Sequence, residues 1–153
     1  MANNELYFGF GSNLSCRRMK ERGARFISRE PASLSGYQLV FNVNRHNDGF
    51  AFANIEPDPN SMVHGALYIC EPGSLKSLDA DHVDVGIFKR IDVKVKRASG
   101  ETINASAYIA TGKEFLKEGL KPSKEYLSEI LEGEDIVPAN YFTFLKSFEE
   151  TKH

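Results

Sequence analysis

Near its start the chain runs Leu6-Tyr7-Phe8-Gly9-Phe10-Gly11-Ser12-Asn13-Leu14. The first residues are typical of a buried strand, and two glycines then flank Phe10 ahead of a helical pattern that begins at Ser15. Glycine permits backbone conformations with positive φ, so successive N–H groups can turn toward one point. A loop of this kind before a helix N-terminus favours a carboxylate or a polarised carbonyl oxygen. An ordinary strand-to-helix turn, with glycines for tight packing, is the alternative interpretation of this stretch alone.

The composition is that of one ordinary globular domain, which we expect to span residues 1–153. The formal net charge is -2 with both signs interspersed, which argues against a nucleic-acid partner or a polybasic membrane contact. Residues 1–5 contain no charged segment followed by a long apolar run, so we expect neither a signal peptide nor a membrane helix. The 2 cysteines are too few for a disulfide framework, which favours free thiols and a cytoplasmic location.

Alternating apolar and polar residues predict about six strands. They cover residues 5–10, 26–43, 50–55, 63–70, 87–95 and 103–110. Pro57 and Pro59 are expected to close the third of these segments, because proline cannot donate to a ladder. Gly65 inside the fourth indicates the close approach of another backbone.

Helical periodicity is confined to short segments between and after these strands. Residues 15–21 and 123–132 are predicted helices, a short helix follows Pro72, and a last one follows Pro138. Residues 79–86 are predicted to form an acidic loop. Strands joined by tight turns with few long crossovers favour an α+β fold with a small curled sheet or barrel over a doubly wound sheet.

Five segments in chain order resemble the γ-glutamylcyclotransferase-like (AIG2-like) family. The first, at residues 7–14, is similar to the family's YFAYGSNL-type segment, and the second, at 63–68, to its V-x-G-x-x-Y strand. Residues 74–79 are similar to its L-x-x-L-D helix end, and residues 87–93 to the strand that follows. The last segment, at 122–127 with 130–133 and 138–141, is similar to a PS-x-x-YL…EG…P-x-x-Y region, so the resemblance spans nearly the whole chain.

The resemblance implies a small mixed β-barrel flanked by helices and an activity that needs no cofactor and no metal. In the family's reaction, the α-amine of a γ-glutamyl amine or γ-glutamyl amino acid attacks its own γ-carbonyl, which forms pyroglutamate and releases an amine. The partner implied is therefore a small γ-glutamyl or related acyl-amine compound. The substrate-binding residues implied are Tyr7, Phe8, Gly9, Phe10, Gly11, Ser12, Asn13 and Tyr126.

One departure from the family pattern falls on the acid/base residue. The family has a glutamate three residues after the aspartate of L-D, whereas here that position after Asp79 is His82. In one account His82 is the base, because the ordinary pKa of histidine suits proton transfer at neutral pH. In a second account Asp81 or Asp84 supplies a carboxylate from a remodelled loop. In a third the chain is a non-catalytic small-molecule-binding protein that retains the pocket.

Two further differences bear on the site. Phe10 and Phe88 stand where the family often has tyrosine, which removes two hydroxyl groups from the expected pocket. Carboxylates and imidazole are also metal ligands, but a solvated acidic segment is the commoner meaning of this composition, and no metal is predicted.

Overall fold

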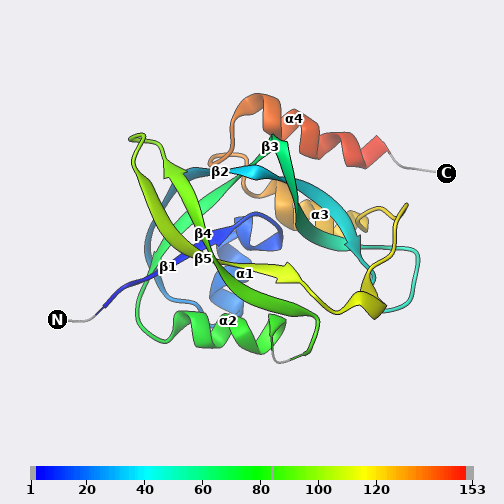
Figure 1. Cartoon of the computed structure of the whole chain (residues 1–153), viewed down its shortest axis with the longest axis horizontal. Helices are drawn as coiled ribbons and strands as arrows, with labels where there is room; N and C mark the ends of the chain where they lie inside the picture. Colours follow the sequence, from blue (N-terminus) through cyan, green and yellow to red (C-terminus); the bar gives the residue numbers. More distant parts are fainter. Residues whose placement is uncertain (1–2, 84, 151–153) are drawn as a thin grey trace.

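The computed structural model describes residues 3–83 and 85–150, and within these ranges five strands close into a barrel with helices against it (Figure 1). The order around the barrel is β1-β3-β2-β4-β5. The pairs are antiparallel except β1 with β5, which is parallel at Tyr7 and Ser106. The predicted α+β fold with a small mixed barrel is therefore confirmed. The strands are β1 (Glu5–Gly9), β2 (Phe26–Val43), β3 (Phe52–Cys70), β4 (Phe88–Arg97) and β5 (Thr102–Ala110).

β3 is one long strand, so the prediction of two separate strands at 50–55 and 63–70 was wrong. The register passes from Tyr37 opposite Pro57 directly to Ser35 opposite Met62, which leaves extra residues on β3 at the irregularity. Because such a bulge needs no ladder bond from its residues, the prolines are tolerated there without ending the strand. Gly36 sits at the same point of β2 with a φ of 86°, a value that favours glycine.

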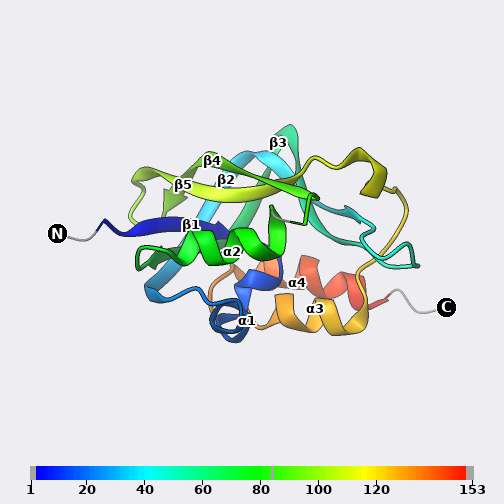
Figure 2. The ribbon, with the colours of Figure 1, turned by 90° about the horizontal axis from the view of Figure 1, so that it is seen from below.

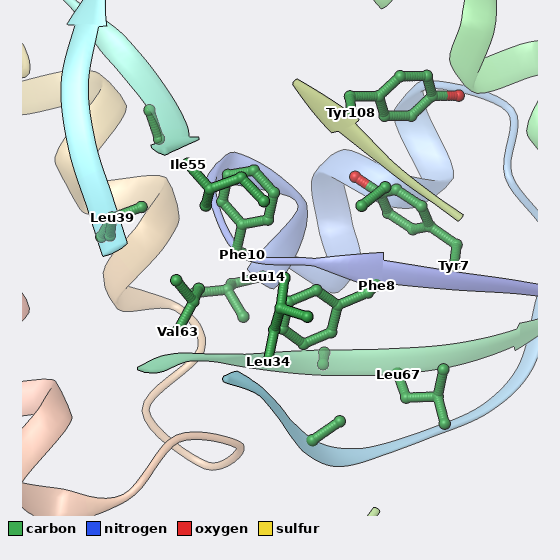
Figure 3. Close-up of a cluster of buried hydrophobic side chains, with 14 of the residues drawn as sticks. Tyr7, Phe8, Phe10, Leu14, Leu34, Leu39, Ile55, Val63, Leu67 and Tyr108 are labelled. Carbon is green, nitrogen blue, oxygen red and sulfur yellow. The ribbon is translucent and has the colours of Figure 1, made fainter. Parts of the chain in front are cut away.

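β1 crosses the middle of the core, and its successive side chains point to opposite sides of the strand. Figure 3 shows Tyr7 and Phe8 leaving opposite sides of β1, Tyr7 toward Tyr108 and Phe8 toward Leu34. Gly65 lies beside the end of this strand, and a Cβ at that position would overlap the carbonyl oxygen of Gly9. The close backbone approach predicted at Gly65 is therefore present.

The helices lie mostly on one side of the barrel, with α1, α3 and α4 in the layer opposite the strands in Figure 2. Ser15 and Ser123 cap α1 and α3, since their hydroxyl oxygens accept from the N–H groups of Arg18 and Tyr126. Three short 3-10 turns, η1 (Ser12–Leu14), η2 (Lys113–Phe115) and η3 (Ser147–Glu150), complete the described structure. The helices are α1 (Cys16–Glu21), α2 (Ser74–His82), α3 (Lys124–Leu131) and α4 (Ala139–Lys146).

α2 continues farther than the sequence predicted. Residues 79–82 were expected in a loop, but the helix extends through His82, and the Val83 N–H still donates to the Asp79 carbonyl at 2.8 Å. Polar composition does not by itself prevent a helix, and Gly86, with a φ of 80°, follows its end. No helix in the described residues is long and apolar enough to cross a membrane.

Candidate active site

The glycine loop between β1 and α1 is held in place by Asn13. Its Nδ2 donates to the Tyr7 hydroxyl at 2.8 Å, and its carbonyl accepts from the Tyr68 hydroxyl at 2.5 Å. Arg22 donates to the Asn13 Oδ1 and to the Ser12 Oγ, the latter at 3.0 Å. The loop is thus connected to the barrel and to the residue that follows α1, so its backbone has a fixed conformation.

Ser12 and Asn13 line a cavity of about 420 Å³. They open the turn η1, whose first backbone bond runs from the Leu14 N–H to the Gly11 carbonyl. A helical turn leaves its first N–H groups without an acceptor inside the turn. Ser12 and Asn13 therefore begin a turn at the cavity, and the role of their N–H groups as donors to a ligand stays a prediction.

Tyr126 reaches the same loop from α3. Its hydroxyl oxygen accepts from the Ala53 N–H at 3.0 Å, and a Cβ at Gly11 would lie 3.1 Å from that oxygen. Burial raises the pKa of Tyr126 to about 12, so the phenol keeps its proton at neutral pH. Because the Ala53 N–H occupies the oxygen as an acceptor, the Tyr126 O–H is the group left to donate to a bound molecule.

His82 lies at the end of α2, and its ring is fixed on two sides. Nδ1 lies 2.7 Å from the Leu78 carbonyl, and the ring stacks on Tyr108 with centroids 4.2 Å apart and planes 11° apart. A carbonyl can only accept, so Nδ1 carries the proton and Nε2 holds a lone pair. Burial lowers the pKa of His82 below its ordinary value of 6.5, so the ring is neutral at pH 7.

Asp79 and Tyr108 form the support behind this histidine. The Tyr108 hydroxyl donates to Asp79 Oδ1 at 2.7 Å, and Asp79 Oδ2 lies 3.3 Å from an Arg90 nitrogen. Burial, followed by the hydrogen bond to Asp79, raises the pKa of Tyr108 well above its usual range, so the phenol stays protonated. Phe88 packs edge-on against His82 at 5.5 Å. Asp79 is therefore engaged away from any ligand, and His82 is the titratable group that these contacts orient.

The two aspartates offered as alternatives to His82 differ in position. Asp81 lines the cavity with its side chain 52% exposed, and its Oδ2 lies 3.7 Å from the Arg22 Nε. Asp84 lies outside the described residues. Among residues 3–83 and 85–150, no cluster of three or more His, Cys, Asp or Glu side chains is arranged to hold a metal ion.

The cavity collects charges of both signs, which suits a molecule carrying an ammonium and a carboxylate group. Arg22 is the most enclosed of its cations: its side chain is 14% exposed, and burial lowers its pKa although it stays charged. On the acidic side, Glu129 lies 3.4 Å from the Arg18 Nε. The charged lining residues are Arg18, Arg22, Arg45, Asp81, Glu125 and Glu129.

Most residues that the resemblance implied come together at this cavity, but two do not line it. Tyr7, Phe10, Gly11, Ser12, Asn13, Tyr126, Asp81 and His82 all line the cavity. Phe8 is fully buried and lies opposite Leu67 in the ladder, while Gly9 lies opposite Ala66. Because side chains alternate along a strand, Phe8 faces the core rather than the cavity. The Phe8 side chain therefore does not line the cavity, and the predicted contacts of Phe8 and Gly9 with substrate stay predictions.

Several lining residues escaped the sequence analysis. Tyr108 and Phe52 sit in strands whose alternation indicates burial but not which cavity a side chain lines. No local motif connects Arg22 to the loop that it contacts. Its distance along the chain from Asn13 is short, and this proximity was the one available signal.

The comparisons with known proteins agree with this geometry. The sequence profile of the AIG2-like family matches residues 62–145, more than half of the chain. The chain belongs to the AIG2-like family. Mouse γ-glutamylcyclotransferase is 28% identical over 157 residues, which cover 97% of this chain and 80% of that protein. The human γ-glutamylcyclotransferase is 29% identical, over 94% of this chain and 78% of that protein.

A solved structure named γ-glutamyl cyclotransferase superposes with a TM-score of 0.82 at 28% identity, over 95% of this chain and 88% of that one. This AIG2-like chain therefore shares the fold of that protein over almost its full length.

Proposed function

We propose that this chain is a cofactor-independent enzyme that cyclises a γ-glutamyl amine or γ-glutamyl amino acid to pyroglutamate, with His82 as the proton-transfer residue. The observation that carries the proposal is that the neutral, oriented imidazole of His82 lines the same cavity as Ser12 and Asn13, whose N–H groups are the proposed oxyanion donors. The reaction needs a base and oxyanion donors, and these two features supply them. A reducing compartment such as the cytoplasm is the proposed location, since both cysteines are free thiols.

The first step removes a proton from the α-ammonium group of the substrate and places it on His82 Nε2. The α-nitrogen then forms a bond to the γ-carbonyl carbon, and the N–H groups of Ser12 and Asn13 stabilise the resulting oxyanion. The bond to the leaving nitrogen breaks as that nitrogen takes the proton from Nε2. The second proton lost by the attacking nitrogen completes the ammonium group of the released amine, so atoms and charges balance.

Holding the substrate in a curled conformation contributes much of the rate, because the attack is intramolecular. A zwitterionic cavity of about 420 Å³ suits this task. The Arg22 guanidinium is placed to attract the substrate carboxylate, and the Tyr126 O–H to orient the carbonyl or the leaving nitrogen.

The test measures pyroglutamate by mass spectrometry after incubation with a panel of γ-glutamyl amines and γ-glutamyl amino acids. His82→Ala is expected to lower kcat/KM by about 10²–10⁴-fold, the usual contribution of general acid–base catalysis. His64→Ala is the matched control, because His64 packs on Tyr141 and does not line the cavity. Full activity in His82→Ala together with loss in Asp81→Asn or Asp84→Asn would transfer the role to an aspartate.

A non-catalytic binding protein is the second candidate, favoured by the imidazole at the glutamate position. His82→Glu distinguishes the two, since it restores the carboxylate of the family motif in an otherwise unchanged cavity. An inactive parent chain that binds γ-glutamyl compounds, and becomes active as His82→Glu, would establish the binding protein. Turnover by the parent chain that is lost in His82→Ala establishes the enzyme.

A further inference from the structure

A second, smaller cavity adjoins the proposed active site. It has a volume of about 100 Å³ and is lined by His46, Asp48, Phe50, Ala51, Phe52, Ser123 and Tyr126. Four of these residues, His46, Phe52, Ser123 and Tyr126, also line the main cavity. The smaller cavity is therefore next to any molecule that is bound in the main cavity.

The wall is built by the connection between β2 and β3, which lies at the right of Figure 1 on the same side as α3. Asn44 organises it: this buried side chain donates to the carbonyls of Asp48 and Phe50 at 2.7 and 2.8 Å. Its backbone N–H donates to the Phe115 carbonyl at 2.7 Å, and the Ala51 N–H donates to the Lys121 carbonyl at 2.9 Å. The connection is therefore anchored from both ends by internal bonds.

The smaller cavity has an apolar part, formed by Phe50, Ala51 and Phe52, beside the polar lining residues His46, Asp48 and Ser123. Phe52 packs edge-on against Tyr126 at 4.8 Å, Ala51 is buried, and the ring of Phe50 remains 52% exposed beside them. A half-exposed aromatic ring next to an open space gains from contact with an aliphatic group, because that contact removes apolar surface from water. Arg45 lines the adjoining part of the main cavity and can receive a carboxylate.

We propose that this smaller cavity is the subsite for the side chain of the leaving amino acid, and that γ-glutamyl amino acids with an aliphatic leaving residue are preferred over γ-glutamyl-glycine. The inference rests on the proposed function. An aliphatic side chain can cover the apolar part of this lining, whereas glycine has no side chain to place there. The carboxylate of the leaving residue faces Arg45.

The experiment compares kcat/KM for γ-glutamyl-glycine, -alanine, -leucine and -tryptophan. The leucine compound is expected to exceed the glycine compound by about 10–100-fold, the range that a few methylene groups contribute in an apolar pocket. Phe50→Ser is expected to bring this leucine-to-glycine ratio close to one. Phe144→Ser is the matched control, because Phe144 is 42% exposed on α4, does not line either cavity, and should leave the ratio unchanged.

Equal kcat/KM values across the panel, or a ratio that Phe50→Ser does not alter, would overturn the subsite while leaving the proposed function intact. If no compound yields pyroglutamate, the proposed function fails, and calorimetric Kd values for the same compounds test the subsite by itself. Tighter binding of the leucine compound that is lost in Phe50→Ser supports the subsite, and equal Kd values reject it. Thermal unfolding of both variants verifies that they are folded.

Discussion

The imidazole of His82 and the phenol ring of Tyr108 lie face to face, with centroids 4.2 Å apart and planes 11° apart. They come from α2 and β5, and the hydroxyl of Tyr108 returns to α2 through its bond to Asp79. With Nδ1 held by the Leu78 carbonyl, the stacking fixes the plane of the ring and hence the direction of Nε2. Tyr108 thus acts as a positioning residue for the proposed base.

Two substitutions of Tyr108 distinguish the contribution of its ring from that of its hydroxyl group. Tyr108→Leu removes the stacked surface and is expected to lower kcat/KM by about 10²-fold, the cost of a misplacement of about 1 Å. Tyr108→Phe keeps the ring and is expected to cost only a few-fold. Steady-state kinetics measure the loss, and NMR titration of the His82 imidazole in both variants shows whether its pKa returns toward 6.5 in Tyr108→Leu alone. Tyr141→Phe, in a buried tyrosine outside the cavity, is the control and should change neither quantity.

The pH dependence of kcat/KM distinguishes the imidazole from a carboxylate as base. Burial lowers the pKa of His82, the Arg22 charge lowers it further, and Asp79 and Asp81 oppose these effects; Tyr108 and Phe88, which also pack against the ring, are uncharged. The active form is the neutral ring, so activity should rise with pH, with its midpoint below 6.5, and should be complete at neutral pH. An acid limb near pH 4, where aspartate ordinarily titrates at about 3.9, would contradict His82 as the base.

The Arg22 side chain donates hydrogen bonds to the loop and also contributes a positive charge to the cavity. Arg22→Met removes the donors to Ser12 and Asn13 and a nearly enclosed positive charge, and is expected to lower kcat/KM by about 10²-fold. Arg22→Lys keeps the charge without the forked donors, so an intermediate loss is expected. Arg25→Met is the control, because the Arg25 side chain is 65% exposed and does not line the cavity. Equal activity of Arg22→Met and the parent chain would remove Arg22 from the site.

The close approach of β1 and β3 gives a prediction on stability. A Cβ at Gly65 would overlap the Gly9 carbonyl oxygen, so Gly65→Ala should lower the free energy of unfolding by about 1–3 kcal/mol. Gly49→Ala meets no atom within 4 Å and should change it little. Urea unfolding measures both variants. If Gly65→Ala and Gly49→Ala have equal free energies of unfolding, the backbones of β1 and β3 move apart without an energetic cost, which would contradict this prediction.

Local sequence patterns were sufficient to locate several elements of this protein. Alternation located the strands that form the barrel, Ser123 marked the start of α3, and the spacing from Gly9 to Asn13 located the loop at the cavity. These features depend on neighbours in the chain, so the amino-acid sequence expresses them directly. The position of His82 relative to the L-D motif also identified the departure from the family pattern.

Only the tertiary structure decided which side chains meet. Nothing near Tyr108 in the chain indicates that it supports His82, because that contact depends on the closure of the barrel, and no local motif connects Arg22 with Asn13. The single strand β3 was missed because prolines end most strands, whereas here a bulge opposite Gly36 accommodates them. Only the tertiary structure decided that the Phe8 side chain faces the core, because the alternation of a strand defines two faces and packing determines which face borders a cavity.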